Sequence, residues 1–446
     1  MAAFYRPERP VKHLEEIMNI EIEKALTNLR ANSSRYDKPV RYYNGDHDLA
    51  FATEKFENTF GTLFREFALN LCPVICDAVR DKLRITGFSV EASTNNSAYS
   101  INSTTRQIWF RNRMASRVGE VHKEALKCGD AYMFVWPNAS GEAILYPHSA
   151  SGVTVVNDDG SPGSIAWAAK AWTNADKRMR MNLFYPDRIE RYISKIKTDT
   201  LPDPSEMIPF SDEAGDAANS VIANPFGIVP VFHFANNADL GKPGRSELEA
   251  AMPVQDGLNK SVLDMLVAME YSAFRQRWAA GIEVEYDEQG KTIAPFQSGI
   301  DHLWIAGNPS AKFGDFETAQ LEQFLKVKDS FRIDMASVTG TPLHYFLQNN
   351  AGLPSGEALK KSETRFIAKV RDRQESFGQV WADVMAFALK VEHGSDAKLI
   401  TEWEDPSPLS EREFLENILL KRQIGLPVDQ ALIEAGYGVA EVSEIT

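Results

Sequence analysis

Cysteine and long apolar runs are scarce in this chain of 446 residues. Its three cysteines, Cys72, Cys76 and Cys128, are too few and too irregular for a disulfide framework, so they favour a reducing compartment. No stretch approaches the roughly 18 apolar residues that span a bilayer, and the N-terminal sequence MAAFYRPERP contains no apolar signal-peptide core. We therefore expect cytoplasmic synthesis, without secretion or membrane insertion.

Basic residues are also fewer than acidic residues. Lysine and arginine number 48 against 62 aspartates and glutamates, which gives a formal net charge of −14 and a pI of about 5.2. At this charge a protein that grips nucleic-acid phosphates would be opposed by its own field, so any DNA contact must be local or non-adhesive. A content of 43% hydrophobic and 25% charged residues indicates a globular protein with two or three cores, not a disordered or fibrous chain.

Motifs for nucleotide binding or hydrolysis are missing as well. The segment that most resembles a nucleotide-binding motif is Gly290-Lys291-Thr292. A phosphate-binding P-loop, however, needs a glycine five residues before its Gly-Lys pair, where this chain has Glu285. We interpret that segment as a hairpin turn and residues 241–244 as a linker. No HExxH pair and no GxSxG elbow occur. The sequence therefore predicts no enzyme activity and no cofactor.

Two kinds of possible metal ligand have simpler interpretations. Cys72 and Cys76 are one helical turn apart, but His122 and Cys128 are the only nearby candidates for further ligands, so buried core cysteines are the better reading. Acidic clusters occur at Asp46 and Asp48, at Asp158 and Asp159, and at Asp212, Glu213 and Asp216. These clusters fall in turns and polar loops, which favours solvated carboxylates and no metal site. A metal-dependent nuclease stays open as an alternative function.

Apolar periodicity predicts that the N-terminal third is mainly helical. Helical spacing runs over residues 13–30, over 64–83 with a break or kink near Pro73, and over 107–127. The polar run 95–103 is expected to be a loop.

A region of short alternating segments comes next. Turn dipeptides at Asp159-Gly160 and Pro162-Gly163 separate these segments and predict an antiparallel meander. The stretch 198–219 is rich in Pro, Asp, Ser and Ala and has no periodicity, so we expect an exposed loop.

The second half of the chain has a distinct order of elements. A long helical stretch with Pro253 in its first turn precedes a small insert with strand-like pieces, and helical spacing then resumes. Turn-forming residues follow, and the stretch from Gly356 to Glu392 contains no proline, which predicts a helix of roughly 54 Å. Two short helices separated by 425–427 are expected near the C-terminus.

This order and several short motifs resemble the portal proteins of tailed bacteriophages. The strand VPVFHFANN leads to a G-x-S-x-L-E-x-A segment and then to QDGLNK, which is similar to the start of that family's stem. A Thr-Gly-Thr-Pro segment followed by PSGEAL resembles the family's passage from the second stem helix through a tunnel loop into a long helix. The motif residues are Gly244, Ser246, Leu248, Glu249 and Ala251, then 255–260, 339–342 and 354–359.

The resemblance covers most of the chain and implies an α+β, helix-dominated portal fold. This fold has a β-rich wing, a two-helix stem, a small α/β clip, a long spine helix and a helical crown. The implied boundaries are 1–252 for the N-terminal wing, 253–278 for the first stem helix, 279–316 for the clip, 317–340 for the second stem helix, 341–355 for the tunnel loop, 356–393 for the long helix and 394–446 for the crown.

The implied function is that of a portal subunit, without catalytic residues of its own. Such subunits would form a dodecameric ring at one capsid vertex of the virion, assembled in the host cytoplasm, as the channel for packaging and ejecting DNA. The implied partners are further copies of the chain, the major capsid protein, the scaffolding protein, the large terminase subunit, a head-to-tail adaptor and double-stranded DNA bound without sequence specificity, with no membrane. Another phage head or neck ring protein is the alternative within the structural class.

Three groups of residues are candidates for contacts. They are the DNA-facing tunnel-loop residues His344, Tyr345, Phe346, Gln348, Asn349 and Asn350, the basic lumen residues Lys260, Lys326 and Lys328, and the clip residues Trp304 and Phe313. Alternatively, the loop aromatics pack on a neighbouring subunit and the lysines form ion pairs between subunits. The basic residues of the long helix alternate with acids, which favours a salt-bridged or intersubunit face over a nucleic-acid interface.

Overall fold

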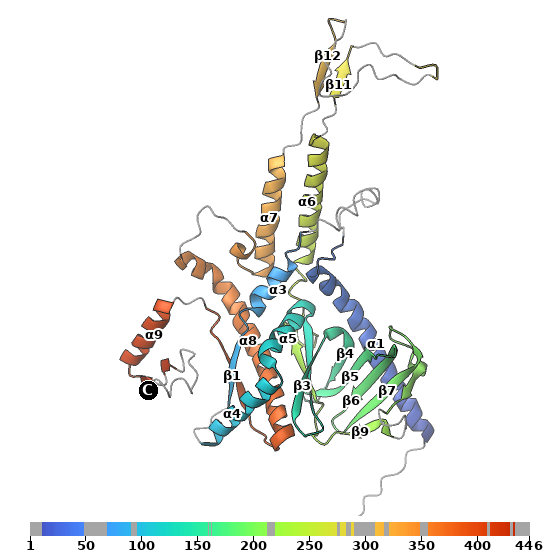
Figure 1. Cartoon of the computed structure of the whole chain (residues 1–446), viewed down its shortest axis with the longest axis vertical. Coiled ribbons are helices and arrows are strands. Elements are labelled where there is room, and N and C mark those ends of the chain that lie inside the picture. Colours follow the sequence, from blue (N-terminus) through green and yellow to red (C-terminus); the bar gives the residue numbers. More distant parts are fainter. Residues whose placement is uncertain are drawn as a thin grey trace, which may run out of the picture. The chain divides into compact units, whose positions relative to one another are not determined.

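The computed structural model describes residues 11–48, 69–90, 96–158, 160–161, 163–211, 219–273, 277–281, 287–289, 308–315, 321–347, 356–407, 411–428 and 431–432. The chain divides into a larger unit, formed by Met1–His47, Asn70–Pro253 and Met335–Thr446, and a smaller unit, formed by Asp48–Leu69 and Val254–Asp334. Both units combine helices with antiparallel strands (Figure 1), which confirms the predicted fold class.

The larger unit contains six α-helices in the described ranges. They are α1 (Val11–Tyr43), α3 (Cys72–Arg80), α4 (Asn96–Arg111), α5 (Met114–Cys128), α8 (Gly356–His393) and α9 (Glu411–Gln423). Three short 3₁₀ turns accompany them, namely η1 (Ala150–Gly152), η2 (Pro204–Glu206) and η4 (Leu343–Tyr345). No helix in the described ranges has both the length and the apolar character to cross a membrane.

Three antiparallel sheets accompany these helices in the described part of the larger unit. The six-stranded sheet has the order β4 (Val153–Asn157), β5 (Ile165–Thr173), β6 (Arg178–Phe184), β7 (Arg188–Lys197) and β8 (Met207–Pro209), with β9 (Val221–Ala223) also paired to β7. The three-stranded sheet has the order β10 (Val231–Ala235), β2 (Asp130–Pro137) and β3 (Ala143–His148). The third sheet pairs β1 (Ile85–Val90) with β13 (Leu399–Trp403). Consecutive strands pair from β4 to β8, which confirms the predicted meander.

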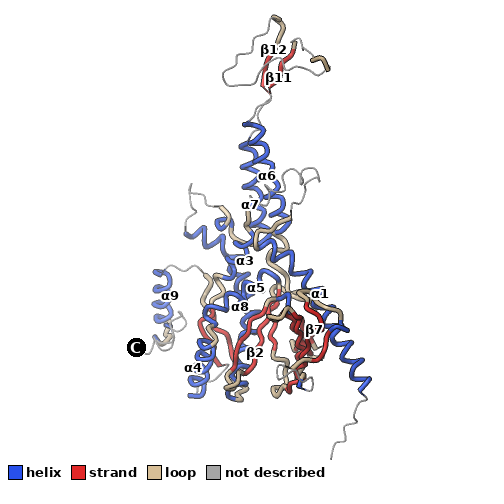
Figure 2. Tube along the Cα trace, turned by 45° about the vertical axis from the view of Figure 1, so that its right-hand side comes forward, coloured by secondary structure: helices blue, strands red, loops and turns tan. Residues whose placement is uncertain are grey.

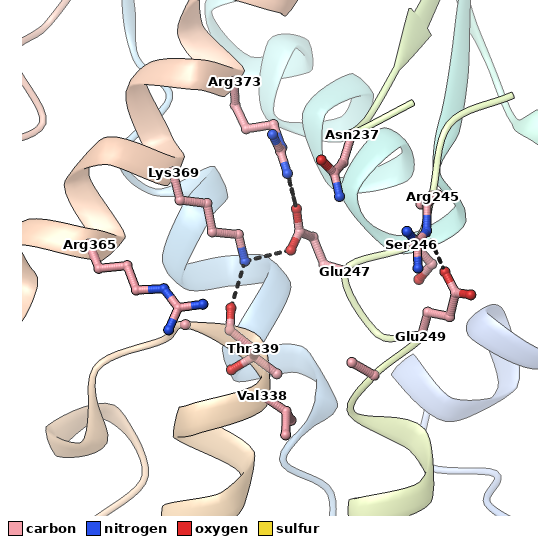
Figure 3. A pocket seen from close by; sticks show the side chains of 12 residues that line it. Asn237, Arg245, Ser246, Glu247, Glu249, Val338, Thr339, Arg365, Lys369 and Arg373 are labelled. Carbon is pink, nitrogen blue, oxygen red and sulfur yellow. Dashed lines mark hydrogen bonds and ion pairs between the residues drawn. The ribbon is translucent and has the colours of Figure 1, made fainter. Parts of the chain in front are cut away.

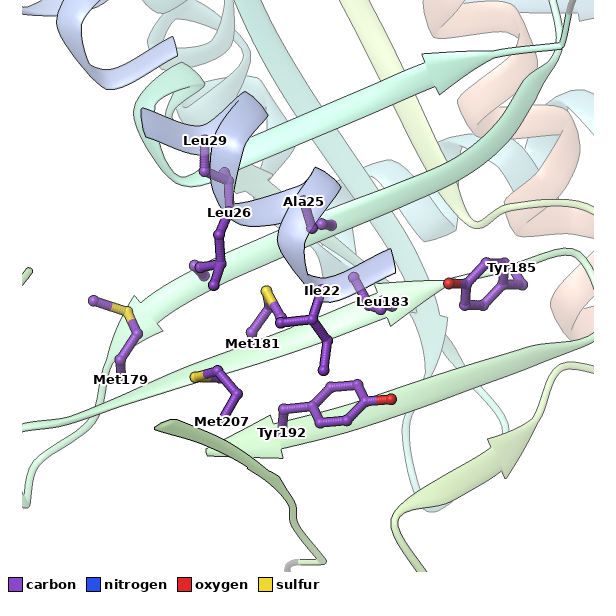
Figure 4. Packing of buried hydrophobic residues seen from close by; sticks show 12 residues of the cluster. Ile22, Ala25, Leu26, Leu29, Met179, Met181, Leu183, Tyr185, Tyr192 and Met207 are labelled. Atoms are coloured by element: carbon purple, nitrogen blue, oxygen red, sulfur yellow. The ribbon is translucent and has the colours of Figure 1, made fainter. Parts of the chain in front are cut away.

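Helix α1 covers one face of the six-stranded sheet. Its buried residues Ile22, Ala25, Leu26 and Leu29 follow helical spacing and pack on sheet residues such as Met181 (Figure 4). The sheet residues of this cluster are Ala169, Ala171, Met179, Met181, Leu183, Tyr185, Tyr192 and Met207. The apolar stripe recognised in the sequence therefore makes the core of this layer.

The opposite face of the six-stranded sheet packs on the three-stranded sheet. Phe134 of β2 contacts Phe184 of β6, with ring centroids 5.0 Å apart, in a shared cluster of buried residues. Helix α8 packs on the other side of the three-stranded sheet, where the rings of Phe234 and Trp381 lie 4.9 Å apart. Figure 2 shows these strands gathered together with α1 and α8 flanking them. The long helix is thus a core element of the larger unit.

In its described residues the smaller unit holds a pair of helices and a two-stranded hairpin. Helix α6 (Met252–Ala273) precedes β11 (Arg277–Ala280), which pairs with β12 (Lys312–Asp315) before α7 (Leu321–Thr339). Pro253 lies in the first turn of α6, as predicted, where a missing backbone N–H costs no helical hydrogen bond. The partial P-loop match at Gly290, interpreted as a hairpin turn, lies outside the described residues.

Two predictions for the N-terminal third were wrong. Residues from Asn96 onward form α4, although the polar run around them was expected to be a loop. The helix expected over 107–127 is two helices, because the Asn112 amide donates to the carbonyls of Ile108 and Ala143 and Arg113 has a left-handed φ of 54°. Side-chain hydrogen bonds of this kind compete with the helical backbone pattern and end the helix.

The remaining predictions for the N-terminal third agree more closely with the structure. Helix α1 extends to Tyr43, beyond the predicted end at residue 30. Pro73 lies in the first turn of α3, which begins there, so the predicted break near Pro73 is confirmed and a kink within a continuous helix is not. Cys72, Cys76 and Cys128 are buried, as expected for core cysteines, and burial raises the pKa of the Cys76 and Cys128 thiols.

Candidate functional site

Helices α6 and α7 of the smaller unit pack together at Gly257. A Cβ built on Gly257 of α6 would lie 2.8 Å from Cε1 of Phe331 on α7, closer than real side chains approach. The absence of a side chain at Gly257 therefore admits the phenyl ring of the facing helix. This contact fixes how closely α6 and α7 approach at that level.

The three candidate lumen lysines differ in their local pairing. The Lys260 Nζ lies 2.5 Å from the Asp264 carboxylate, and the Lys326 Nζ lies 3.3 Å from the Glu322 carboxylate, each four residues away on the same helix. Lys328 makes no ion pair with any residue that the structure describes. Since the charges of Lys260 and Lys326 are shared locally, Lys328 has the charge most available to a DNA phosphate.

The hairpin presents two aromatic side chains. Phe313 is 40% exposed and lies opposite Ala279 in the register, whereas Trp278 is 37% exposed and lies opposite Gly314. Successive residues of a strand point to opposite faces, so the two aromatics lie on different faces of the hairpin. The Trp278 ring covers Gly314, where an added Cβ would lie 2.7 Å from Cζ2. Trp304 lies outside the described residues.

Trp278 was missed as a candidate because the sequence pattern placed it at the end of a stem helix. Helix α6 ends at Ala273, and Trp278 belongs to strand β11.

The first residues of the predicted tunnel loop pack on their own chain. The His344 Nε2 lies 3.3 Å from the Glu363 carboxylate of α8, and the Tyr345 ring centroid lies 5.8 Å from that of Phe366. Burial, together with the negative charge of Glu363, raises the pKa of the Tyr345 hydroxyl. Phe346 is 6% exposed, which leaves its side chain little surface for DNA.

These contacts anchor the segment to α8 of the same chain. Gln348, Asn349 and Asn350 lie outside the described residues. A DNA-facing role for this loop stays a prediction, and the His344 side chain is 32% exposed.

A polar cluster that sequence reasoning missed lies in the larger unit (Figure 3). Glu247, in the segment before α6, is 8% exposed and accepts two cations of α8. The Lys369 Nζ lies 2.5 Å from its carboxylate, and the Arg373 guanidinium, which is 5% exposed, lies 3.0 Å away. Burial alone would raise the pKa of Glu247, but these two cations outweigh it and hold the pKa below its ordinary value.

The same lysine also reaches the end of α7. Lys369 donates a hydrogen bond from Nζ to the Thr339 carbonyl over 3.0 Å. One side chain of α8 therefore binds both the segment before α6 and the last residue of α7. The signal in the sequence was the i, i+4 spacing of Lys369 and Arg373, which places both on one face of the helix.

A second buried carboxylate organises the neighbouring strands. Asp130 is fully buried and accepts hydrogen bonds from the Tyr36 hydroxyl at 2.6 Å, from the His233 Nε2 at 2.7 Å and from the Gly244 backbone N–H at 2.8 Å. Burial by itself would raise the pKa of Asp130, but these donors lower it. An added Cβ on Gly244 would overlap the Gly129 carbonyl, so glycine is required where the two backbones meet.

The acidic clusters considered as metal ligands have ordinary roles where they are described. The Asp158 carboxylate accepts the Gly160 backbone N–H within a turn, and Asp46 lies 3.8 Å from Arg41. Asp159, Asp212, Glu213 and Asp216 lie outside the described residues. Across the described ranges, no three His, Cys, Asp or Glu side chains gather as a metal site would require.

Hydrogen bonds and ion pairs at these sites join helices to strands and to other segments of the larger unit. A family model described as "Phage portal protein, SPP1 Gp6-like" matches residues 22–441. The chain therefore belongs to the phage portal protein family. Proteins of this family are structural and not enzymatic.

Two curated relatives carry the same description. The portal protein of Mycobacterium phage L5 is 26% identical over 267 residues, which cover 56% of this chain and 54% of the relative. The portal protein of Mycobacterium phage D29 is 25% identical over 268 residues, 56% of this chain and 55% of the relative. The matched region thus spans about half the length of these relatives. A solved structure described as "Neck of empty GTA particle computed with C6 symmetry" has a TM-score of 0.48 and 12% identity, covering 87% of this chain and 95% of that one.

Proposed function

We propose that this chain assembles into a closed dodecameric ring at a single capsid vertex and forms the channel for packaging and ejecting double-stranded DNA. The single observation that carries this proposal is the order of elements that follows the sheets: α6, the β11–β12 hairpin, α7, the η4 segment and the 38-residue helix α8. Family membership supports the same function.

The parts of the portal follow from that order. We assign α6 and α7 to the stem, the residues between them to the clip, residues 341–355 to the tunnel loop and α8 to the spine of the wing. Residues 1–252 form the rest of the wing, and residues 394–446 form the crown. The close contact of Phe331 with Gly257 supports a tightly packed stem.

The charge of the chain suits a conduit. A wall rich in lysine and arginine would bind phosphates at every step, whereas a net charge of −14 per subunit keeps the polyanion from adhering. Salt screens these charges beyond roughly 8–10 Å, so the wall acts at close range. Local pairing of Lys260 and Lys326 fits this weakly adhesive surface, and Lys328 supplies a single point of contact on each subunit.

The remaining partners are assigned by chemistry. Exposed aromatic side chains anchor protein interfaces, so Trp278 and Phe313 on the hairpin, with Trp304 in the same segment, are proposed to bind the head-to-tail adaptor and the large terminase subunit. The major capsid protein and the scaffolding protein would contact the wing during assembly in the host cytoplasm. The ring would then remain in the virion at its unique vertex.

Cryo-electron microscopy of the purified chain tests the proposal. We expect rings with a central channel and a stem narrower than the wing, with twelve subunits. A chain that stays monomeric at high concentration, or a ring without a stem, would overturn it. The second outcome would favour a different head or neck ring protein.

A further inference from the structure

A cavity of about 300 Å³ opens beside the Glu247 cluster in the larger unit (Figure 3). Its walls come from the segment before α6, the end of α7 and the first half of α8. Four cationic and two anionic side chains line it, namely Arg245, Arg365, Lys369, Arg373, Glu247 and Glu249. This local surplus of positive charge stands out in a chain whose net charge is −14.

Most of these charges are already paired. Glu247 accepts both Lys369 and Arg373, and the Arg245 Nε lies 3.0 Å from the Glu249 carboxylate. Arg365 is different, because it forms no ion pair in the part of the chain that the structure describes. Among the residues that the structure describes, Arg365 is thus the cation lining the cavity whose charge is open to a further anion.

Arg365 lies beside the turn that contains Gly340. A Cβ built on Gly340 would lie 3.7 Å from the Arg365 Nε, and Gly340 has a φ of 67°, which favours glycine. The guanidinium points toward Thr339 in Figure 3, and the Arg365 side chain is exposed to solvent.

Asn237 also lines the cavity, from the segment before α6. It has a left-handed φ of 45°, a conformation that asparagine tolerates better than most residues. Its amide makes no hydrogen bond within the described ranges. Asn237 thus adds an amide to the lining, while the Arg365 guanidinium is the group suited to bind a further anion directly.

We propose that this cavity binds a carboxylate side chain of a second copy of the chain, held by Arg365. The proposal rests on the ring proposed above, because a closed ring joins two different surfaces of each subunit. Arginine binds carboxylates through two parallel hydrogen bonds, and the chain carries 62 acidic residues to supply one. A carboxylate on a side chain can enter this recess, whereas a DNA duplex is too wide to follow its phosphates into it.

Charge reversal at Arg365 tests the proposal. We expect Arg365→Glu to raise the subunit concentration needed for half-maximal ring assembly at least ten-fold, measured by mass photometry, with an unchanged circular dichroism spectrum. Arg365→Lys should retain most of the assembly. The control is Lys361→Glu, which makes the same charge change at an exposed position one turn earlier on α8 and should assemble like the wild type.

The outcomes separate the two proposals. If the wild-type chain forms no rings, the proposed function fails. If the wild type and Arg365→Glu assemble equally, only the carboxylate contact is overturned. Equal assembly together with weakened DNA retention in the ring would assign the cavity to a phosphate and would also overturn the contact. Should Arg365→Glu misfold, Arg365→Gln provides the same comparison without a new negative charge.

Discussion

The phenyl ring of Phe331 on α7 lies against the backbone of Gly257 on α6, so that a Cβ at position 257 would come within 2.8 Å of Cε1. A small residue facing a large one lets two helices approach closely while the space between them stays filled. Any side chain at position 257 must therefore move either the ring or the helix.

Gly257→Ala should lower the stability of the helix pair. Alanine is favoured over glycine in a helix by about 1 kcal/mol, but overpacking typically costs about 1–3 kcal/mol, so we expect a net loss of up to about 2 kcal/mol. Denaturant unfolding measures the change. Gly119→Ala on α5 is the matched control, because its nearest neighbour would be 3.9 Å away and the substitution should stabilise the protein.

A second substitution separates the clash from other effects. Phe331→Leu removes the ring atoms that the new methyl group meets, so the double variant should recover most of the loss caused by Gly257→Ala. If Gly257→Ala alone and Gly257→Ala combined with Phe331→Leu lose the same stability, the Phe331 ring is not the cause of the loss.

Glu247→Gln should destabilise the larger unit strongly. The variant leaves Lys369 and Arg373 without the carboxylate that both share, and breaking a buried ion pair by removing one partner costs about 3–5 kcal/mol. The midpoint of denaturant unfolding, followed by tryptophan fluorescence, measures the loss. Glu249→Gln removes the same charge from an exposed pair with Arg245 and should cost less than about 1 kcal/mol. A similar small loss for both variants would contradict a buried cluster.

His122 should make the stability of the larger unit depend on pH. The residue is fully buried and accepts a hydrogen bond from the Trp381 indole at 2.9 Å, and burial lowers its pKa from 6.5 to about 3. Between these values only the unfolded chain binds the proton, so stability falls as the pH drops below about 6.5, by at most about 1.4 kcal/mol per pH unit, and levels off below about 3.

The variant His122→Gln keeps an acceptor for Trp381 but cannot titrate. We expect its unfolding midpoint to change less between pH 7 and pH 4 than that of the wild type. His148, whose pKa is lowered to about 4, contributes equally to both proteins. Parallel pH profiles for the two proteins would show that His122 is not the responsible group.

Local patterns explain why much of the fold was predictable. The period-two segments with turn dipeptides give the meander from β4 to β8, and the helical stripe with Leu26 and Leu29 covers it. The long stretch without proline forms α8. In each case the information lies within one element and its turns.

Contacts between distant segments explain what was missed. Helix α4 has a polar start, but Trp109 packs between Phe88 and Trp381, and such packing stabilises helices whose own propensity is weak. Glu247 meets Lys369 and Arg373 only after more than a hundred residues of chain fold between them. A contact between segments so far apart leaves no local sequence pattern, so the cluster and its cavity could be recognised only in the three-dimensional structure.

Lys328 should influence DNA in the channel more than Lys326 does, although both lie on α7. Lys326 shares its charge with Glu322, whereas Lys328 has no ion pair among the residues described. We expect Lys328→Gln to leave ring assembly unchanged, to weaken DNA retention, and to reduce the dependence of log K on log salt by about one for each lost phosphate contact. Lys326→Gln is the matched control with a smaller effect. The test is DNA retention measured across a range of salt concentrations. Equal slopes of log K against log salt for the wild type and Lys328→Gln would show that this lysine does not contact the DNA.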